Sequence, residues 1–333
     1  MTAFTRNLTQ TLAVAAAAAL LAACGSSSGG DGTREKTGFL KLGITDAPVD
    51  FADEVVVQFS GVELKPTAGP AFSIDFAPRR YNLLAYDGTD RAILLDGVEI
   101  PAGEYEWLRL KVDADAHFGG DSYVRIATPG DACEMRIPSG AETGLKIIRG
   151  FTVAVGALTD FTIDFDLSKS LVAPPGQSMP GGSCAGQVYM LKPVLRMVNN
   201  MQVGSISGSV HPNLITAQCV PAGEPPYPGK VYLFGPITAD NAGLPEDNDD
   251  TDPDPNGAPV ATARVSDSTF TYTIGFVAPG TYRVAYTCDL DDPALDASAP
   301  AAEETVVFTP SDVPTVTVTA SAVADADFGP PAP

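Results

Sequence analysis

From residue 38 onward the sequence consists of short segments in which apolar and polar residues alternate, separated by Gly, Pro, Asp and Asn. Residues 161–167, FTIDFDL, are a clear example. Because successive side chains of a strand point to opposite faces, this pattern predicts one buried and one wet face, with Asp164 and Asp166 in solvent. No interval combines helical period with helical length. The chain is therefore expected to be all-β, with antiparallel strands.

These segments form two groups, and the composition changes between them at residues 199–204. The first group, residues 38–200, predicts one antiparallel β-sandwich, and its segments are FLKLGIT, EVVVQFSGVEL, RAILL, YEWLRLKV, SYVRI, LKIIRGFTVAV, DFTIDFDL and QVYMLKPVLRMV. The second group, residues 204–320, predicts another sandwich, and its segments are VGSISGSV, KVYLFG, APVATARV, STFTYTIGF, GTYRVAYTC, ETVVF and PTVTVTAS. Residues 321–333 are expected to fray as a flexible tail.

The first 23 residues have the layout of a signal peptide. Residues 1–10 are polar with one positive charge, and residues 11–23 are almost wholly apolar. This apolar stretch is shorter than the roughly 20 residues that a membrane-spanning helix needs, so no span is expected in the mature chain. Residues 25–37 are rich in Gly and Ser, which predicts a flexible tether.

The segment Leu21–Cys24, with sequence LAAC, resembles the lipobox of bacterial lipoproteins. The resemblance implies that Cys24 becomes the mature N-terminus and carries lipid, which anchors the protein to a membrane. An ordinary secreted protein with a spare cysteine is the alternative. In Gram-negative lipoproteins an Asp after the cysteine favours retention at the inner membrane. Gly25 stands there instead, which favours the outer membrane of the cell envelope.

Four further cysteines remain in a chain that is expected to be exported, where disulfides form. They are Cys133, Cys184, Cys219 and Cys288. Four cysteines permit three pairings, and pairing within each sandwich is preferred, because two cysteines fall on each side of the composition break. A metal site is disfavoured, because no CxxC spacing occurs and the chain has two histidines.

The formal net charge of −21 narrows the range of partners. Residues 38–203 carry 14 Lys and Arg against 21 Asp and Glu, and residues 204–333 carry 3 against 18. Nucleic acid is therefore excluded as the default partner, since phosphate binding needs clustered cations. Anionic lipid surfaces are disfavoured for the same reason, which leaves cations, neutral glycans and proteins.

Strand 105–112 contains the only Trp of the chain. Alternation places Tyr105, Trp107 and Arg109 on one face, where they would form a small stacking platform for a sugar or a peptide. The alternative is packing under a loop, because aromatic residues at the start of a strand commonly cover the edge of a core.

An acidic loop, PEDNDDTDPDPNG at residues 245–257, is the strongest indication of a metal-binding site in the sequence. Its carboxylates suit calcium and belong to Asp247, Asp249, Asp250, Asp252 and Asp254. The EF-hand pattern fails, however, because counting from Asp247 the sixth residue is not Gly and the twelfth is Ala258. A solvated loop is the alternative, and no other cofactor is expected.

Five segments of the first group resemble a bacterial family of unknown function, the domain family numbered 4382. They are TDAPVD (45–50), IPAGEYEWLRLKV (100–112), IPSGAETGLKI (137–147), DFTIDFDLSKSLV (160–172) and YMLKPVLRMV (189–198). The resemblance implies a lipid-anchored envelope protein and brings no catalytic residues. Residues 270–288 resemble the transthyretin-like modules of carboxypeptidase regulatory domains, in which a Pro-Gly turn leads into a Tyr-bearing strand.

The sequence therefore predicts a lipid-anchored, non-catalytic envelope protein that acts as an interaction or scaffolding module. Its partners would be the membrane, through Cys24, and an envelope or extracellular protein or glycan. A calcium-braced adhesin or glycan-binding surface protein is the first alternative. An envelope hydrolase is less favoured, because no group of acid, base and metal ligands is evident.

Overall fold

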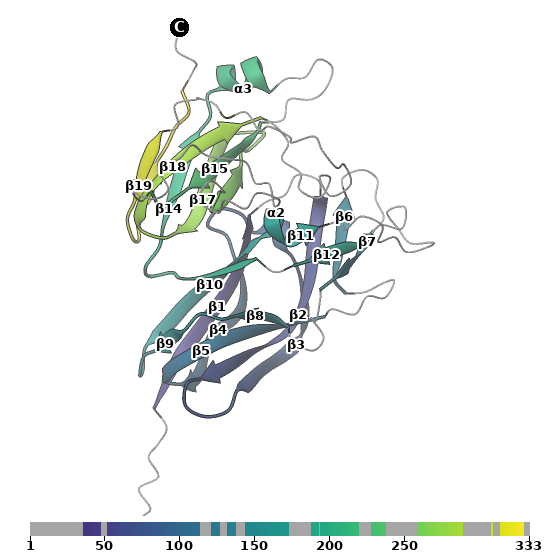
Figure 1. The fold of residues 1–333 in the computed structure, drawn as a ribbon, viewed down its shortest axis with the longest axis vertical. Helices are drawn as coiled ribbons and strands as arrows, with labels where there is room; N and C mark the ends of the chain where they lie inside the picture. Colours follow the sequence, from purple (N-terminus) through teal and green to yellow (C-terminus); the bar gives the residue numbers. More distant parts are fainter. Residues whose placement is uncertain are drawn as a thin grey trace, which may run out of the picture. The chain divides into compact units, whose positions relative to one another are not determined.

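The computed structural model confirms the all-β prediction (Figure 1). It describes residues 36–47, 52–113, 121–126, 132–137, 144–172, 188–192, 194–219, 228–237, 259–288, 308 and 314–329. Two pairs of sheets are found there, one pair in each of the two predicted sandwich regions. No helix in these ranges is long and apolar enough to cross a membrane.

One sheet of the first sandwich has four strands. Their order is β13 (Leu195–Asn199), β10 (Leu158–Asp166), β1 (Thr37–Ala47) and β4 (Ala92–Pro101). β1 and β10 pair in parallel, while the other pairs are antiparallel. The sheet is therefore not purely antiparallel. Between β1 and β10 the chain crosses to the second sheet, and β10 then enters the first sheet in the same direction as β1.

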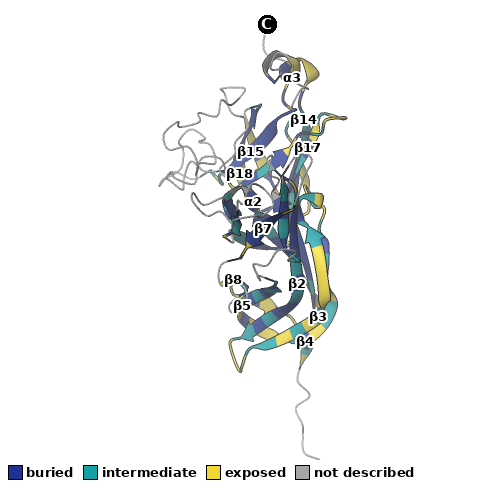
Figure 2. Cartoon of the chain, turned by 90° about the vertical axis from the view of Figure 1, so that its right-hand side faces the viewer, coloured by how far each residue is buried: buried dark blue, intermediate teal, exposed yellow. Residues whose placement is uncertain are grey.

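The second sheet of this sandwich is longer. Its path is β11 (Leu171–Val172), β12 (Tyr189–Leu191), β7 (Ala132–Arg136), β6 (Tyr123–Ile126), β2 (Ala52–Pro66), β5 (Gly103–Val112) and β8 (Leu145–Ile147). β3 (Phe72–Asn82) pairs with β2, and β9 (Phe151–Val153) pairs with β5. The segment 145–155, expected as one strand, is thus two strands that both pair with β5. Several consecutive residues of β3 are exposed, which explains why its apolar–polar alternation is weak (Figure 2).

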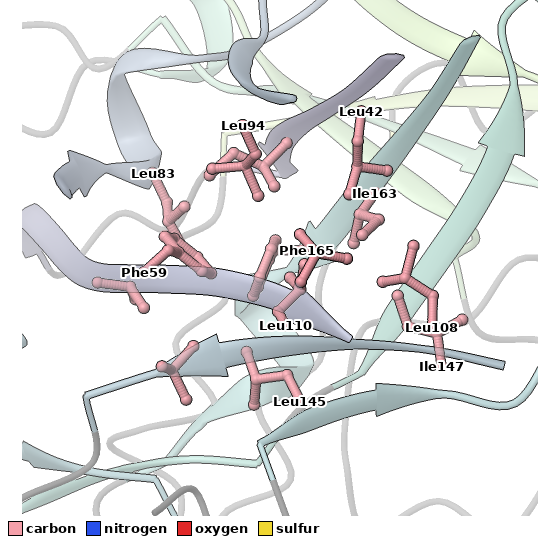
Figure 3. Close-up of a cluster of buried hydrophobic side chains, with 14 of the residues drawn as sticks. Leu42, Phe59, Leu83, Leu94, Leu108, Leu110, Leu145, Ile147, Ile163 and Phe165 are labelled. Carbon is pink, nitrogen blue, oxygen red and sulfur yellow. The ribbon is translucent and has the colours of Figure 1, made fainter. Parts of the chain in front are cut away.

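The core of the first sandwich lies between these two sheets (Figure 3). β1 and β10 contribute Leu42 and Ile163, which are fully buried, and β2 and β5 contribute Phe59 and Leu110. Burying a side chain of this size stabilises the fold by about 1.5–3 kcal/mol. The alternation read from the sequence therefore identifies the inner face of β10 correctly, and that of β5 from Leu108 to Val112.

The second sandwich pairs a three-stranded sheet with a four-stranded one. The first has the order β17 (Thr271–Val277), β14 (Gly204–Ser209) and β20 (Val323–Asp325). The second has the order β16 (Ala261–Arg264), β15 (Lys230–Phe234), β18 (Gly280–Thr287) and β19 (Thr315–Val318). Of the predicted segments of this region, ETVVF lies outside the described residues except for Phe308.

Within the described ranges, three short helical segments connect strands, namely η1 (Leu83–Ala85), α2 (Leu167–Ser170) and α3 (Pro212–Gln218). The sequence did not predict α3, although it carries helix-start signals. Pro212 occupies the first turn, and the His211 Nδ1 accepts a hydrogen bond of 3.2 Å from the backbone N–H of Asn213. α3 buries Leu214 and Ile215 in the second core, and this burial rather than helix propensity stabilises so short a helix.

The same turn chemistry recurs in both sandwiches. In PAGEY the Tyr105 hydroxyl donates to the carbonyl of Pro101 at 2.7 Å, and in APGTY the Tyr282 hydroxyl donates to the carbonyl of Ala278 at 2.8 Å. Both tyrosines are buried, so each hydroxyl requires a partner. The turn before each Tyr-bearing strand is thereby fixed to the strand that follows it.

The expectation of a flexible tail after Ala320 is wrong for residues 321–329. β20 pairs in parallel with β14, and Phe328 is only 3% exposed in the second core. Asp327 accepts hydrogen bonds from both the backbone N–H and the hydroxyl of Ser209. The chain end completes the three-stranded sheet, because β14 would otherwise leave one edge and part of the core uncovered.

Removing the Tyr105 or the Tyr282 hydroxyl should destabilise its own sandwich. Tyr105→Phe and Tyr282→Phe each leave a carbonyl without its partner, which is expected to cost about 1–2 kcal/mol of unfolding free energy. Guanidinium unfolding followed by circular dichroism measures the change. Tyr123→Phe is the control, because its hydroxyl bonds the partly exposed Glu54. Equal stability in all three variants would show that the turns do not need these bonds.

The packing of the chain end makes a second prediction. Phe328→Ala should lower the unfolding free energy of the second sandwich by about 3–5 kcal/mol, because it opens a cavity in the core. Val323→Ala, on the same segment but 68% exposed, should change it by less than about 0.5 kcal/mol. Thermal unfolding followed by circular dichroism compares the two, and identical midpoints would contradict the packed position of Phe328.

Candidate functional site

The outer surface of β2, β5 and β8 carries the most distinctive side chains outside the cores. β5 turns Leu108 and Leu110 inward, and therefore Trp107 and Arg109 outward. We call this surface the Trp107 face. Its residues are Glu63, Lys65, Trp107, Arg109, Lys111 and Lys146, with Asp75 of β3 at its border.

Cross-strand register brings these residues together from three segments of the sequence. Arg109 lies opposite Glu63 on one side and opposite Lys146 on the other. Trp107 lies opposite Lys65 in the next row. Directly opposed side chains in a sheet lie close enough to interact, so the face is one continuous surface.

Two cations lie over the indole ring of Trp107. The Arg109 guanidinium carbon is 5.0 Å from the ring centroid, and the Lys146 ammonium is 4.3 Å from it. Each contact is worth about 0.5–1 kcal/mol at an exposed site. Arg109 also forms an ion pair of 2.9 Å with Glu63. The ring and the carboxylate hold the two cations in place and keep them at the surface.

The Trp107 face is locally positive. Lys65, Arg109, Lys111 and Lys146 supply four positive charges, against the carboxylates of Glu63 and Asp75. Lys111 pairs with Asp75 at 2.7 Å, while Lys65 donates to the carbonyls of Pro66 and Gly69. The exposed Glu106 lies at an irregularity of β5 beside these residues. Even with Glu106 included, positive charge is in excess here.

Tyr105, by contrast, does not belong to this surface. Its ring is 2% exposed and stacks on the Phe151 ring with centroids 4.9 Å apart. The register between β2 and β5 shifts at Lys65 and Pro66, which places Glu106 out of step with the ladder. Tyr105 and Leu108 therefore both face the core. The platform expected from Tyr105, Trp107 and Arg109 is reduced to Trp107 and Arg109, and it gains the lysines that the sequence did not point to.

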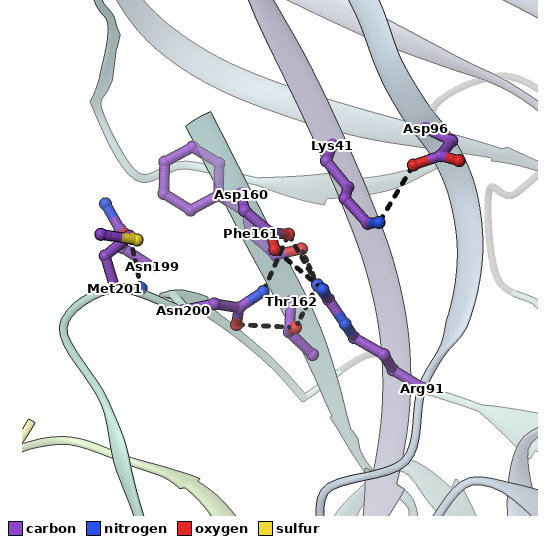
Figure 4. Close-up of polar contacts among 9 residues, drawn as sticks. All are labelled: Lys41, Arg91, Asp96, Asp160, Phe161, Thr162, Asn199, Asn200 and Met201. Atoms are coloured by element: carbon purple, nitrogen blue, oxygen red, sulfur yellow. Dashed lines mark hydrogen bonds and ion pairs between the residues drawn. The ribbon is translucent and has the colours of Figure 1, made fainter. Parts of the chain in front are cut away.

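The polar face of β10 is not a solvated surface, contrary to expectation. Asp160 accepts two hydrogen bonds from Arg91 and one from the side-chain NH2 of Asn200, and the Thr162 hydroxyl donates to the side-chain Oδ1 of Asn200 (Figure 4). Thr162 is fully buried. These bonds connect β10 to the segment that leads into the second sandwich, which is a structural role.

Asp164 and Asp166 likewise have cationic partners. Asp164 pairs with Arg196, and its side chain is 13% exposed, while Asp166 pairs with Lys169. Burial raises the pKa of the Asp164 carboxyl, and the Arg196 ion pair opposes that shift. A pair of carboxylates with its cations already in place braces the fold rather than forming an acid and base pair.

A polar hollow of about 500 Å³ lies between residues 87–90 and the strands β16 and β17. Its walls include Asp87, Asp90 and Asp267 together with Arg264. No group of three His, Cys, Asp or Glu suited to a metal occurs among the residues that the structure describes. The hollow therefore has acidic walls without a metal-ligand arrangement.

The remaining predicted sites are described only in part. Cys219 and Cys288 form a disulfide with Cα atoms 5.0 Å apart, as preferred from the sequence. Cys133 is disulfide-bonded, whereas Cys184 and Cys24 lie outside the described residues. The acidic loop with Asp247, Asp249, Asp250, Asp252 and Asp254 also lies outside them.

The comparison with protein families concerns the first sandwich. Residues 37–193 match the family model described as "Domain of unknown function (DUF4382)". The first sandwich is therefore similar to DUF4382 domains over these residues. The match confirms the resemblance seen in the sequence for less than half of the chain, and the family description assigns no activity. No curated protein matches the chain.

Some solved structures match with very low similarity. A leucine-rich repeat protein from Bacteroides thetaiotaomicron is 10% identical over 88% of this chain and 26% of its own, with a TM-score of 0.19. The minor pilin GBS52 from Streptococcus agalactiae is 10% identical over 86% and 94%, with a TM-score of 0.18. The major pilin BcpA from Bacillus cereus is 11% identical over 88% and 99%, with a TM-score of 0.18. Such scores do not define a shared fold.

The electrostatics around Trp107 make a testable prediction. Because it is the only Trp of the chain, quenching of its fluorescence reports the local charge. Iodide should quench it more efficiently than caesium, since the neighbouring cations attract anions despite the net charge of −21. Lys146→Glu should reverse this order, and high salt should remove the difference. More efficient quenching by caesium in the parent protein would contradict a positive Trp107 face.

Proposed function

We propose that this protein is a lipid-anchored, non-catalytic component of the cell envelope that binds a partner through the Trp107 face. The observation that carries the proposal is the gathering of an indole and four cations on one outer sheet face. These side chains do not fill a core, and two of the cations are held over the ring. Aromatic and Arg side chains of this kind are enriched where proteins bind partners.

The leader and the cysteines support the envelope location. A lipid on Cys24 would attach the chain to a membrane without a spanning segment. The 11 residues 25–35 separate that lipid from Lys36 in the sequence. The Cys219–Cys288 disulfide fits an oxidising, extracytoplasmic compartment. Gly25 after the lipidated residue favours the outer membrane.

Among binding roles, a glycan-binding surface protein is favoured over a scaffold without a ligand, because of Trp107. An indole offers an apolar face and edge to a sugar at low conformational cost. A calcium-braced adhesin remains a proposal that depends on the acidic loop at residues 245–257.

Removal of the lipid site tests the anchor. With its native leader, the protein should incorporate labelled palmitate in a bacterial host and partition into detergent and membrane fractions. Cys24→Ala should lose the label and shift to the aqueous fraction, because no acyl chain remains to hold it.

Ser26→Ala is the matched control for this experiment, since it changes the same segment without removing the thiol. It should behave as the parent protein does. A Cys24→Ala variant that keeps the label or stays in the membrane fraction would overturn the proposed lipid anchor.

A further inference from the structure

We propose that the Trp107 face binds an acidic polysaccharide, a glycan whose sugars carry carboxylate or sulfate groups. This inference rests on the proposed function, in that it names the ligand class of the same surface. The net charge of −21 favours neutral glycans, but net charge describes the whole chain. The strand register nevertheless places several cations side by side on the Trp107 face. A ligand in contact with this face responds to the charges within the Debye length of about 8 Å rather than to the net charge of the chain.

The cations form a two-dimensional array. Arg109 and Lys146 are cross-strand neighbours, so their backbones lie about 4.8 Å apart, and Lys111 lies two residues along β5, about 6.6 Å away. Cations repeated at this interval can meet anions that repeat along a polymer. A single small anion would engage only one or two of them.

Arg109 is partly exposed and can contact such a ligand. Its Nη1 pairs with Glu63 and its Nε is buried, while 23% of its side chain remains in solvent. A guanidinium donates in a planar fork that matches carboxylate and sulfate oxygens. Lys146 is exposed and Lys111 keeps about a third of its side chain in solvent, so both can reach a ligand.

The position of the array within the sheet favours a glycan over an acidic peptide. β2 and β5 are interior strands, and their backbone N–H and C=O groups are used in ladders with neighbours on both sides. Peptides that bind sheets commonly add a strand to an open edge, which needs free backbone groups. A sheet face offers side chains alone. Charged groups and an indole edge are what an acidic sugar with apolar C–H faces recognises.

The test uses the full mature chain made without lipid by the Cys24→Ser change. Trp107 fluorescence is followed at low salt during titration with polygalacturonate, neutral dextran, polyglutamate and phosphatidylglycerol vesicles. Polygalacturonate should produce a saturable change that weakens as salt is raised. The other three should bind at least about tenfold more weakly, because each lacks the sugar, the charge or the fit.

Charge-reversal variants locate the interaction. Lys111→Glu and Lys146→Glu should each weaken polygalacturonate binding about tenfold, since each exchanges an attraction for a repulsion. Lys192→Glu is the matched control, because it makes the same charge change at an exposed residue that follows β12. It should bind within about twofold of the parent. An equal loss in Lys192→Glu would show a net-charge effect only and overturn the site.

The outcomes separate this inference from the proposed function. Equal or stronger binding of polyglutamate, dextran or the vesicles, abolished by Lys146→Glu, would overturn the acidic polysaccharide and leave the Trp107 face as a binding surface. No fluorescence change with any of the four probes at low salt would overturn both the inference and the binding role.

Discussion

The apolar contact between the two sheets of the first sandwich is the constraint on which the rest of the molecule depends. Leu42 and Ile163 from one sheet meet Phe59 and Leu110 from the other, and all four are almost completely removed from water. Because side chains alternate along a strand, committing these residues to the core commits their neighbours to the outside. The exposure of Trp107 and Arg109 is thus a consequence of the inward direction of Leu108 and Leu110. A one-residue slip of β5 would lose the core and the Trp107 face together.

The outer faces of β10 and β5 have similar sequence patterns but different surroundings in the fold. β10 and β5 both alternate apolar and polar residues. On β10 the polar side chains are hydrogen-bonded within the protein, since Asp160 accepts hydrogen bonds from Arg91 and Asn200. On β5 the cations remain exposed or half-exposed, with a ring and two carboxylates beside them. A face whose charged groups are largely buried with their partners braces the structure, whereas a face whose charged groups stay partly in solvent can also contact a ligand.

Strong alternation was sufficient to predict most strands, and weak or long-range signals were not. β3 was missed because it is largely exposed and contains Pro78 followed by two arginines. β20 was missed because three residues become a strand only by pairing with β14, which is more than a hundred residues earlier. Of the site, Trp107 and Arg109 were predicted. Lys146 and Glu63 were not, because register decides their proximity, and Tyr105 was misplaced because a bulge reverses its direction.

The distribution of charge between the two regions determines which part of the chain would attract the proposed ligand. Residues 38–203 hold 14 of the 20 Lys and Arg, while residues 204–333 hold 3 against 18 acidic residues. A polyanion is therefore repelled by the second region and attracted only where cations are concentrated. Salt screens both the attraction and the repulsion beyond a short distance, so a polyanion that approaches another part of the surface is not attracted by the Trp107 face. An acidic chain can thus bind an acidic polymer selectively at the proposed site, because the surrounding negative charge disfavours contacts elsewhere.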